Sequence, residues 1–172
     1  PESLRLVDGA QPEEGRIEIY HDGRWGTVCG HQWDDVDARV ACIQLGFDVS
    51  IETGPRLFPP GGGTIWFEDV SCGGGEARLV DCDHGPFGET DCDHFDDVGV
   101  VCDTDGDGYG DNSSGTNGDA CPGAVGNSTV DRKGCKDSDG DGWSDASDMF
   151  RNDPTQWSDR DGDRIDVFEL IS

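Results

Sequence analysis

Basic residues and long apolar runs are scarce in this 172-residue sequence. Lys and Arg number 12 against 38 Asp and Glu, which gives a formal net charge of -26. Such a chain repels phosphates, so nucleic acid is excluded as a partner. No apolar run approaches the roughly 20 residues that a membrane span needs, and no charged-then-apolar leader is present. We therefore expect no membrane insertion, and either a mature secreted piece or an excised fragment.

Apolar residues are also too few for a large core. Only 33% of the sequence is hydrophobic and 27 residues are Gly, so other links must stabilise the fold. The even number of Cys, 8, indicates four disulfides and an oxidising compartment, either extracellular or at the cell surface. Zinc-binding thiols are the alternative, but no C-x-x-C pair exists. Sequons at Asn112 and Asn127 allow N-glycosylation, in agreement with secretion.

Catalytic constellations are missing as well. The sequence has no Ser/His/Asp or Cys/His arrangement with free thiols, and its four His lack the spacing of zinc proteases. It therefore predicts no enzyme.

The stretch DTDGDGYGD, residues 103–111, places acids at alternate positions with Gly between them. Two carboxylates about 4 Å apart near a protein surface repel by roughly 4 kcal/mol, so converging acids need a cation. Calcium takes six to eight oxygens, and loops of this kind supply side chains at positions 1, 3 and 5, a carbonyl at 7 and an acid near 9 or 12. The candidate ligands are Asp103, Asp105, Asp107, the Tyr109 carbonyl and Asp111. A disordered acidic linker is the alternative.

Two further copies of the spacing favour calcium. DSDGDGWSDASD follows at residues 137–148, and DRDGDRIDVFE starts the pattern again at residue 159, with Arg164 in place of the expected Gly. The second copy offers Asp137, Asp139, Asp141, the Trp143 carbonyl, Asp145 and Asp148, and the third offers Asp159, Asp161, Asp163 and Glu169. Phased copies predict a repeat architecture clamped by several Ca2+ ions in place of an apolar core.

Signals of regular structure are confined to residues 1–102. RIEIYHDGRWGTVC, residues 16–29, predicts a β-hairpin that turns at Asp22-Gly23. DDVDARVACIQLGF, residues 34–47, predicts a helix with Val36, Val40 and Ile43 on its apolar face and Gly46 at its end. TIWFEDV and VGVVC indicate short strands. We expect an α+β fold, in which residues 1–102 form a small disulfide-stapled curved antiparallel sheet with one main helix. Residues 103–172 would be an irregular calcium-loop segment with little regular secondary structure.

The motifs LRLVDG, GRWGTVCGHQWDDVDARVACIQLGF, FEDVSCGGGEARLVDC and CDHFDDVGVVC occur in this order. Together they resemble a scavenger receptor cysteine-rich domain of the six-cysteine subgroup. The resemblance implies the disulfides Cys29–Cys92, Cys42–Cys102 and Cys72–Cys82. Residues 103–172 are similar to thrombospondin type 3 repeats, which implies a fourth pair, Cys121–Cys135.

The resemblance to the scavenger receptor domains also implies cation sites. Asp34, Glu68 and Asp91 match one set of ligands. At the other set Gly30 and His31 stand where the family has an acid pair, which leaves Asp96 alone. The alternative for these acids is hydrogen bonding at the surface or helix capping.

These features predict an extracellular calcium-binding adhesion or recognition module. Its scavenger receptor domain would bind a protein or glycan ligand through a cation, on a calcium-stiffened stalk. The alternative is a structural subunit of an extracellular fibre or sheath, assembled through calcium, glycans and copies of itself.

Overall fold

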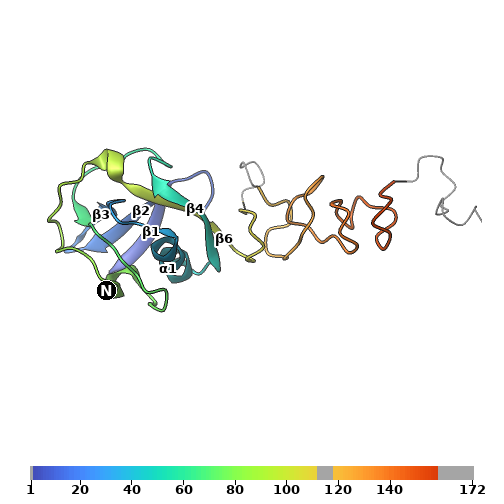
Figure 1. The fold of residues 1–172 in the computed structure, drawn as a ribbon. Helices are drawn as coiled ribbons and strands as arrows, with labels where there is room; N and C mark the ends of the chain where they lie inside the picture. The colour runs from blue at the N-terminus through green and yellow to red at the C-terminus, as the bar shows by residue number, and fades with distance from the viewer. Residues whose placement is uncertain (1, 112–117, 159–172) are drawn as a thin grey trace, which may run out of the picture.

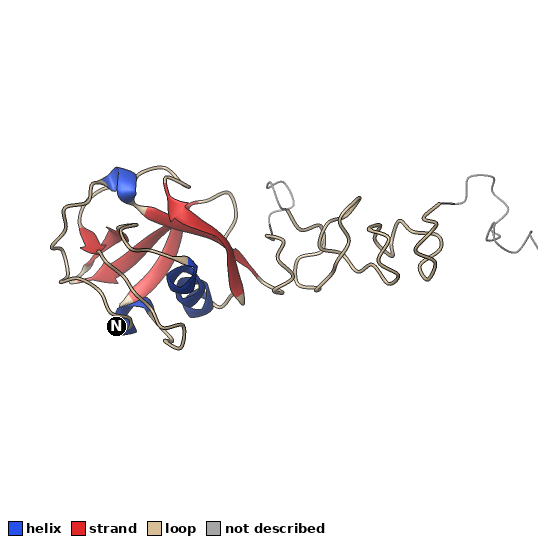
Figure 2. Ribbon diagram, viewed as in Figure 1, coloured by secondary structure: helices blue, strands red, loops and turns tan. Residues whose placement is uncertain are grey.

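A computed structural model describes residues 2–111 and 118–158. Helices and strands gather in its first part, which we call the head (residues 2–102), as Figure 2 shows. We call residues 103–158 the repeat segment, and after Asp103, the last residue of the last strand, its described residues form turns and bends. Its described part contains one isolated bridge, between Gly110 and Gly118. The segment leads away from the head at the end of the last strand (Figure 1).

The head is built on a six-stranded sheet. Its strands are β1 (Ser3–Asp8), β2 (Glu14–His21), β3 (Arg24–Val28), β4 (Val49–Pro55), β5 (Ile65–Phe67) and β6 (Val98–Asp103). The order is β4-β6-β2-β3-β5, and β1 pairs with β2 outside this path. Four pairings are antiparallel, as expected, but β3 and β5 run parallel. The chain between them passes through a helix and β4, and such a long crossover permits parallel pairing.

The hairpin of β2 and β3 forms where the sequence predicts it. Asp22 and Gly23 have φ values of 47° and 80°, the two positive-φ positions of a turn that matches the twist of the flanking strands. Alternation along β2 directs Ile17 and Ile19 into the core.

Helix α1 (Asp35–Leu45) lies against the sheet and ends at Gly46, whose φ of 97° places it in the left-handed region. Its buried side chains include Val40, as expected, but Val36 and Ile43 are exposed. That part of the prediction was wrong, because the helix buries the small Ala38, Ala41 and Cys42 instead. Two single 3-10 turns, η1 (Leu79–Asp81) and η2 (His94–Asp96), complete the head.

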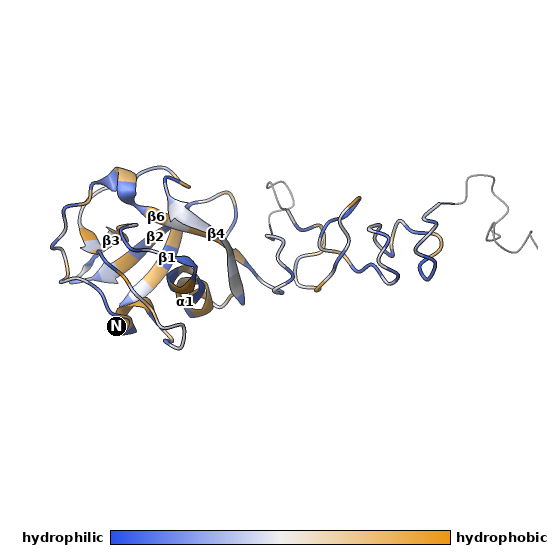
Figure 3. Cartoon of the chain, viewed as in Figure 1, coloured by the Kyte–Doolittle hydropathy of each residue, from blue (hydrophilic) through white to orange (hydrophobic). Residues whose placement is uncertain are grey.

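The core of the head combines the inner face of the sheet with α1, and Figure 3 shows hydrophobic residues on both. Phe67 and Val98 are completely buried, and each such side chain stabilises the fold by roughly 1.5–3 kcal/mol. The exposed Phe95 lies outside this core.

Four disulfides link the eight Cys, in the same pairs that the resemblances imply. They are Cys29–Cys92, Cys42–Cys102, Cys72–Cys82 and Cys121–Cys135. The first three lie in the head and the fourth in the repeat segment. Over the described residues, no helix has the length and apolar character needed to cross a membrane.

Candidate metal sites

The first acidic loop wraps backbone amides around its own carboxylates. Asp103 is completely buried, and its Oδ1 accepts hydrogen bonds from the amides of Asp105 (3.1 Å) and Gly106 (2.9 Å). Its Oδ2 accepts from the amide of Gly108 (2.9 Å). Gly106 and Gly108 have φ values of 77° and 91°, which only Gly adopts without strain. The loop therefore places oxygens of Asp103, Asp105 and Asp107 within 4.8 Å of one another.

The second loop repeats this geometry. Asp137 Oδ1 accepts from the amide of Gly140 (2.7 Å), and its Oδ2 accepts from the amide of Gly142 (2.8 Å). Oxygens of Asp137, Asp139 and Asp141 again lie within 4.8 Å of one another. The same chain spacing thus produces the same cluster twice.

The residue at position 7 is held beside the acid at position 5 in both loops. The amide of Tyr109 donates to Asp107 Oδ1 (2.9 Å), and the amide of Trp143 donates to Asp141 Oδ1 (2.7 Å). The carbonyl ligands expected from Tyr109 and Trp143 stay a prediction.

The acids at position 9 close the loops. Asp111 Oδ1 accepts from the amide of Thr104 (3.1 Å), and Asp145 Oδ1 accepts from the amide of Ser138 (2.8 Å). Lys136 Nζ lies 2.9 Å from Asp145 Oδ2, and this contact lowers the pKa of Asp145. Neither acid belongs to the three-acid clusters, so their role as direct ligands stays a prediction.

A further buried acid accompanies each loop. In the first loop it is Asp119, which is completely buried and whose Oδ1 accepts from the amide of Cys121 (2.6 Å). Burial and the charges of Asp107 and Asp105 raise the pKa of Asp119 to about 6, against the opposing bond from Cys121. In the second loop Asp148 is 4% exposed, and burial and repulsion from Asp139 raise its pKa.

Asp148 was predicted from its position 12, but Asp119 was missed. Seven residues separate Asp111 from Asp119, whereas two separate Asp145 from Asp148, so Asp119 stands at position 17 of its loop, where fixed spacing does not find it. One sequence feature could have indicated Asp119: it stands two residues before Cys121. The disulfide partner of Cys121 is Cys135, which stands two residues before the second loop.

Four carboxylate oxygens in these loops are buried and have no hydrogen-bond partner. They are Oδ2 of Asp105, Asp119, Asp139 and Asp141. A buried carboxylate without a donor is costly, by several kcal/mol if it is ionised. Oxygens that converge without donors suit a hard cation such as Ca2+, which is coordinated by oxygen at 2.3–2.6 Å in general. The residues present therefore fit calcium.

The two loops are joined by the segment that carries the second sequon. The amide of Gly126 donates to Asp107 Oδ2 (3.0 Å), and Asn127 Oδ1 accepts from the amide of Asp137 (3.2 Å). The amide of Thr129 donates to the carbonyl of Gly142 (2.9 Å). Disulfide Cys121–Cys135 closes the same region. The sequon at Asn112 and the third acidic copy, with Asp159, Asp161, Asp163 and Glu169, lie outside the described residues.

In the head, Asp34 caps helix α1. Its Oδ1 accepts from the amides of Val36 (2.8 Å) and Asp37 (3.2 Å), and Asp37 Oδ2 accepts from the amide of Asp34 (2.8 Å). This reciprocal capping box is the alternative that the sequence left open for Asp34.

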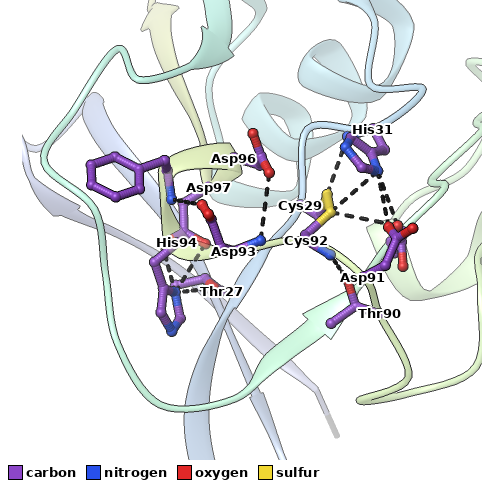
Figure 4. Close-up of a disulfide and its surroundings, with 12 residues drawn as sticks. Thr27, Cys29, His31, Thr90, Asp91, Cys92, Asp93, His94, Asp96 and Asp97 are labelled. Carbon is purple, nitrogen blue, oxygen red and sulfur yellow. Dashed lines mark hydrogen bonds and ion pairs between the residues drawn. A yellow bond between two sulfur atoms is a disulfide. The ribbon is translucent and has the colours of Figure 1, made fainter.

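Glu68 and Asp91, the other two predicted ligands, both contact His31, and Figure 4 shows Asp91 beside the His31 ring. His31 Nδ1 is 3.0 Å from Glu68 Oε1 and 3.6 Å from Asp91 Oδ1. The bond to Glu68 and the charges of Asp91 and Asp96 raise the pKa of His31. Burial opposes ionisation of Glu68, yet bonds from Thr90 and His31 give it a lowered pKa. His31 was expected to weaken a different site, and the structure instead brings its Nδ1 into contact with both of these acids.

Asp96 lies at the end of η2. Its Oδ2 accepts from the amide of Asp93 at 3.5 Å, and Asp93 Oδ1 accepts from the amide of Phe95 at 2.7 Å. Asp96 is thus held in the capping box of a 3-10 turn.

Comparison with known proteins identifies the class of the head. The scavenger receptor cysteine-rich (SRCR) domain family matches residues 7–103, more than half of the chain, so the chain belongs to this family. SRCR domains are extracellular or cell-surface recognition domains without enzymatic activity.

Two solved structures illustrate the likeness. The third SRCR domain of murine neurotrypsin is 38% identical, with a TM-score of 0.55, over 59% of this chain and 96% of that chain. The SRCR domain of mouse MARCO, in its dimeric form, is 37% identical, with a TM-score of 0.50, over 57% of this chain and 92% of that chain. Their coverage corresponds in size to the head.

Proposed function

We propose that this chain is an extracellular calcium-dependent recognition module. The SRCR head, of the six-cysteine subgroup, binds a protein or glycan ligand, and the repeat segment, of the thrombospondin type 3 kind, is a calcium-stiffened stalk. The observation that carries the calcium assignment is the set of four buried, unpartnered carboxylate oxygens in two loops of the same geometry.

Bound calcium stabilises the repeat segment in place of an apolar core. Among the described residues from 103 onward, Cys135 is the one buried apolar side chain, whereas Asp103, Asp119, Asp137 and Asp148 are buried acids. In each loop a divalent ion cancels the repulsion of acids that the backbone holds together. Binding energy then becomes folding energy for this segment, as in small metal-dependent domains.

The surface of the head constrains its ligand. Residues 1–102 contain 21 acids and 6 basic residues, and the most buried of these cations, Arg16, already pairs with Asp8 and Glu18. A bare anionic polymer would be repelled at long range. The head therefore recognises cationic surfaces directly, and anionic groups or sugar hydroxyls through a bound metal ion.

Self-assembly into a fibre or sheath is the second candidate. Several large apolar side chains of the repeat segment are exposed: Val125, Val130, Met149 and Trp157. The MARCO domain has been crystallised in a dimeric form. Two chains this acidic repel each other at long range, so side-by-side packing would need bridging cations or glycans.

Small-angle scattering and calorimetry on the full chain test the proposal. Calcium should bind with at least two sites and lengthen the particle as the stalk stiffens, while the mass stays that of one chain. A mass that rises with calcium would favour the assembly function instead. No calcium heat would refute both calcium-dependent functions.

A further inference from the structure

The candidate metal ligands of the head do not suit calcium. Calcium prefers hard oxygen ligands, and the structure places an imidazole nitrogen, His31 Nδ1, beside an oxygen of Glu68 and an oxygen of Asp91. Asp34, the third oxygen ligand that the family resemblance implies, caps α1, and its Oδ1 accepts bonds from two backbone amides at the start of that helix. The donor set at this point is therefore one nitrogen and two carboxylates.

A set of one imidazole and two carboxylates is typical of zinc and other transition metals. Zinc lies about 2.0–2.1 Å from nitrogen and oxygen ligands, so two ligands at corners of a tetrahedron are about 3.3 Å apart. The distances from His31 Nδ1 to Glu68 Oε1 and Asp91 Oδ1, 3.0 and 3.6 Å, bracket this value. Both distances start from the same nitrogen, so an ion bound to His31 Nδ1 would lie next to an oxygen of each acid.

The fold holds the three residues in place before any metal binds. Disulfide Cys29–Cys92 joins the residue two before His31 to the residue after Asp91. Glu68 directly follows β5, and the amide of Cys29 donates to the carbonyl of Phe67 at 2.8 Å. One disulfide and one strand pairing therefore fix all three positions.

The site is open on its outer side. The side chains of His31 and Asp91 are 47% and 89% exposed, while that of Glu68 is 13% exposed. Cys92 Sγ lies 3.3 Å from His31 Nδ1, but both sulfurs belong to a disulfide and are not thiolate ligands. An ion held here keeps a coordination position that faces solvent.

We propose that His31, Glu68 and Asp91 form a binding site for zinc or a similar divalent transition metal, selective against calcium. The open position accepts an oxygen or nitrogen from a ligand of the head. This inference deepens the recognition role of the head proposed above and does not depend on the calcium loops.

The test is a zinc titration of the full chain in excess calcium, which keeps the acidic loops filled. Calorimetry should detect one zinc ion per chain, and the NMR signals of the His31 ring should shift with zinc. His31→Gln should weaken zinc binding at least about tenfold. Loss of a side chain that only supports a metal ligand already lowers metal affinity about tenfold or more, and here the ligand itself is removed. His84→Gln is the matched control, because its ring stacks on Phe67 at 4.2 Å and bonds the carbonyl of Gly85.

A second variant separates coordination from simple charge attraction. His31→Asp adds a negative charge but exchanges the imidazole nitrogen for carboxylate oxygens, which also bind zinc. Coordination by the imidazole therefore predicts weaker zinc binding than in the parent but a smaller loss than in His31→Gln, whereas simple charge attraction predicts stronger zinc binding. Thermal unfolding of both variants should match that of the parent, since His31 is half-exposed. Unchanged zinc binding in His31→Gln, stronger zinc binding in His31→Asp, or no zinc heat in the parent chain would overturn the proposal and leave the calcium assignment of the loops unaffected.

Discussion

The head and the repeat segment solve the same stability problem in opposite ways. In the head, strands and α1 enclose a core that includes Ile17, Val40 and Phe67, all completely buried. In the described part of the repeat segment the completely buried side chains are polar: Asp103, Asp119, Ser128 and Ser144. The head excludes water from apolar groups, whereas the segment surrounds carboxylates with its own backbone amides.

This difference determines what each part depends on. An apolar core is stabilised by burial whether or not calcium is present. Clustered acids, in contrast, are stable only when a cation or a proton neutralises them. The two parts should therefore respond independently to calcium, and the following predictions use that independence.

Removal of calcium should have the largest effect. Excess chelator should increase hydrogen exchange strongly across residues 103–158, because repulsion among the acids is no longer balanced, while α1 and β2 keep their protection. Exchange mass spectrometry with and without chelator measures both parts in one experiment. Equal protection of the repeat segment in both conditions would refute the ion-clamp interpretation.

Removal of the disulfide in the repeat segment should have the second-largest effect. Cys121–Cys135 closes a loop with a sequence separation of 14, which in the chain-entropy model is worth roughly 3 kcal/mol. The double change Cys121→Ala and Cys135→Ala should therefore weaken calcium binding by the segment, since the ions must then also order a freer chain.

The matched control is the head disulfide Cys72–Cys82, with a separation of 10. Its replacement by two Ala should lower the melting temperature of the head and leave calcium binding unchanged. A loss of calcium affinity with this control pair would contradict the independence of the two parts.

The third prediction compares two acids of the first loop. Asp119→Asn keeps the acceptor for the Cys121 amide but removes the buried charge, so calcium affinity at this loop should fall at least about tenfold, or about 1.4 kcal/mol. Without calcium the same change should stabilise the segment, because it relieves repulsion from Asp107 and Asp105. Calorimetry and thermal unfolding measure the two opposite effects.

Asp111→Asn is the comparison. Asp111 accepts a bond from the amide of Thr104 (3.1 Å) at the loop closure, and an Asn carbonyl can accept the same bond. Its loss of calcium affinity should be smaller than that of Asp119→Asn. Equal losses would make Asp111 a direct ligand, as the sequence spacing suggests.

The sequence predicts features that depend on local chemistry. The Asp22-Gly23 turn and the Gly46 helix end follow from backbone conformations that few residues adopt. The alternating acids of the loops predict their clusters, because each Gly-rich turn is formed within a few residues. The fold of the head followed from ordered motifs that resemble the SRCR family.

Features that depend on distant contacts were not predictable in the same way. The parallel pairing of β3 with β5, the burial of Asp119 and the contact of His31 with Glu68 each join residues far apart in the sequence. The apolar face of α1 was misjudged because helical spacing marks several faces, and the sheet decides which is covered. Disulfide Cys29–Cys92, implied by the family, brings His31 and Asp91 together, but the pairing alone did not indicate their contact.

The smallest predicted effect concerns Asp34, because its two possible roles, metal ligand and helix cap, predict different results for its substitution. Asp34→Ala should destabilise the head by about 1 kcal/mol, as loss of a helix cap does. Asp34→Asn should cost almost nothing, because Asn accepts the bonds from Val36 and Asp37 equally well at this position. Neither change should alter calcium or zinc binding by the full chain, since both proposed kinds of site exclude Asp34. Thermal unfolding and metal calorimetry of the two variants measure stability and binding separately. A loss of metal binding in Asp34→Asn at unchanged stability would restore Asp34 to the ligand set with Glu68 and Asp91, and would show that the head retains the cation site of its family.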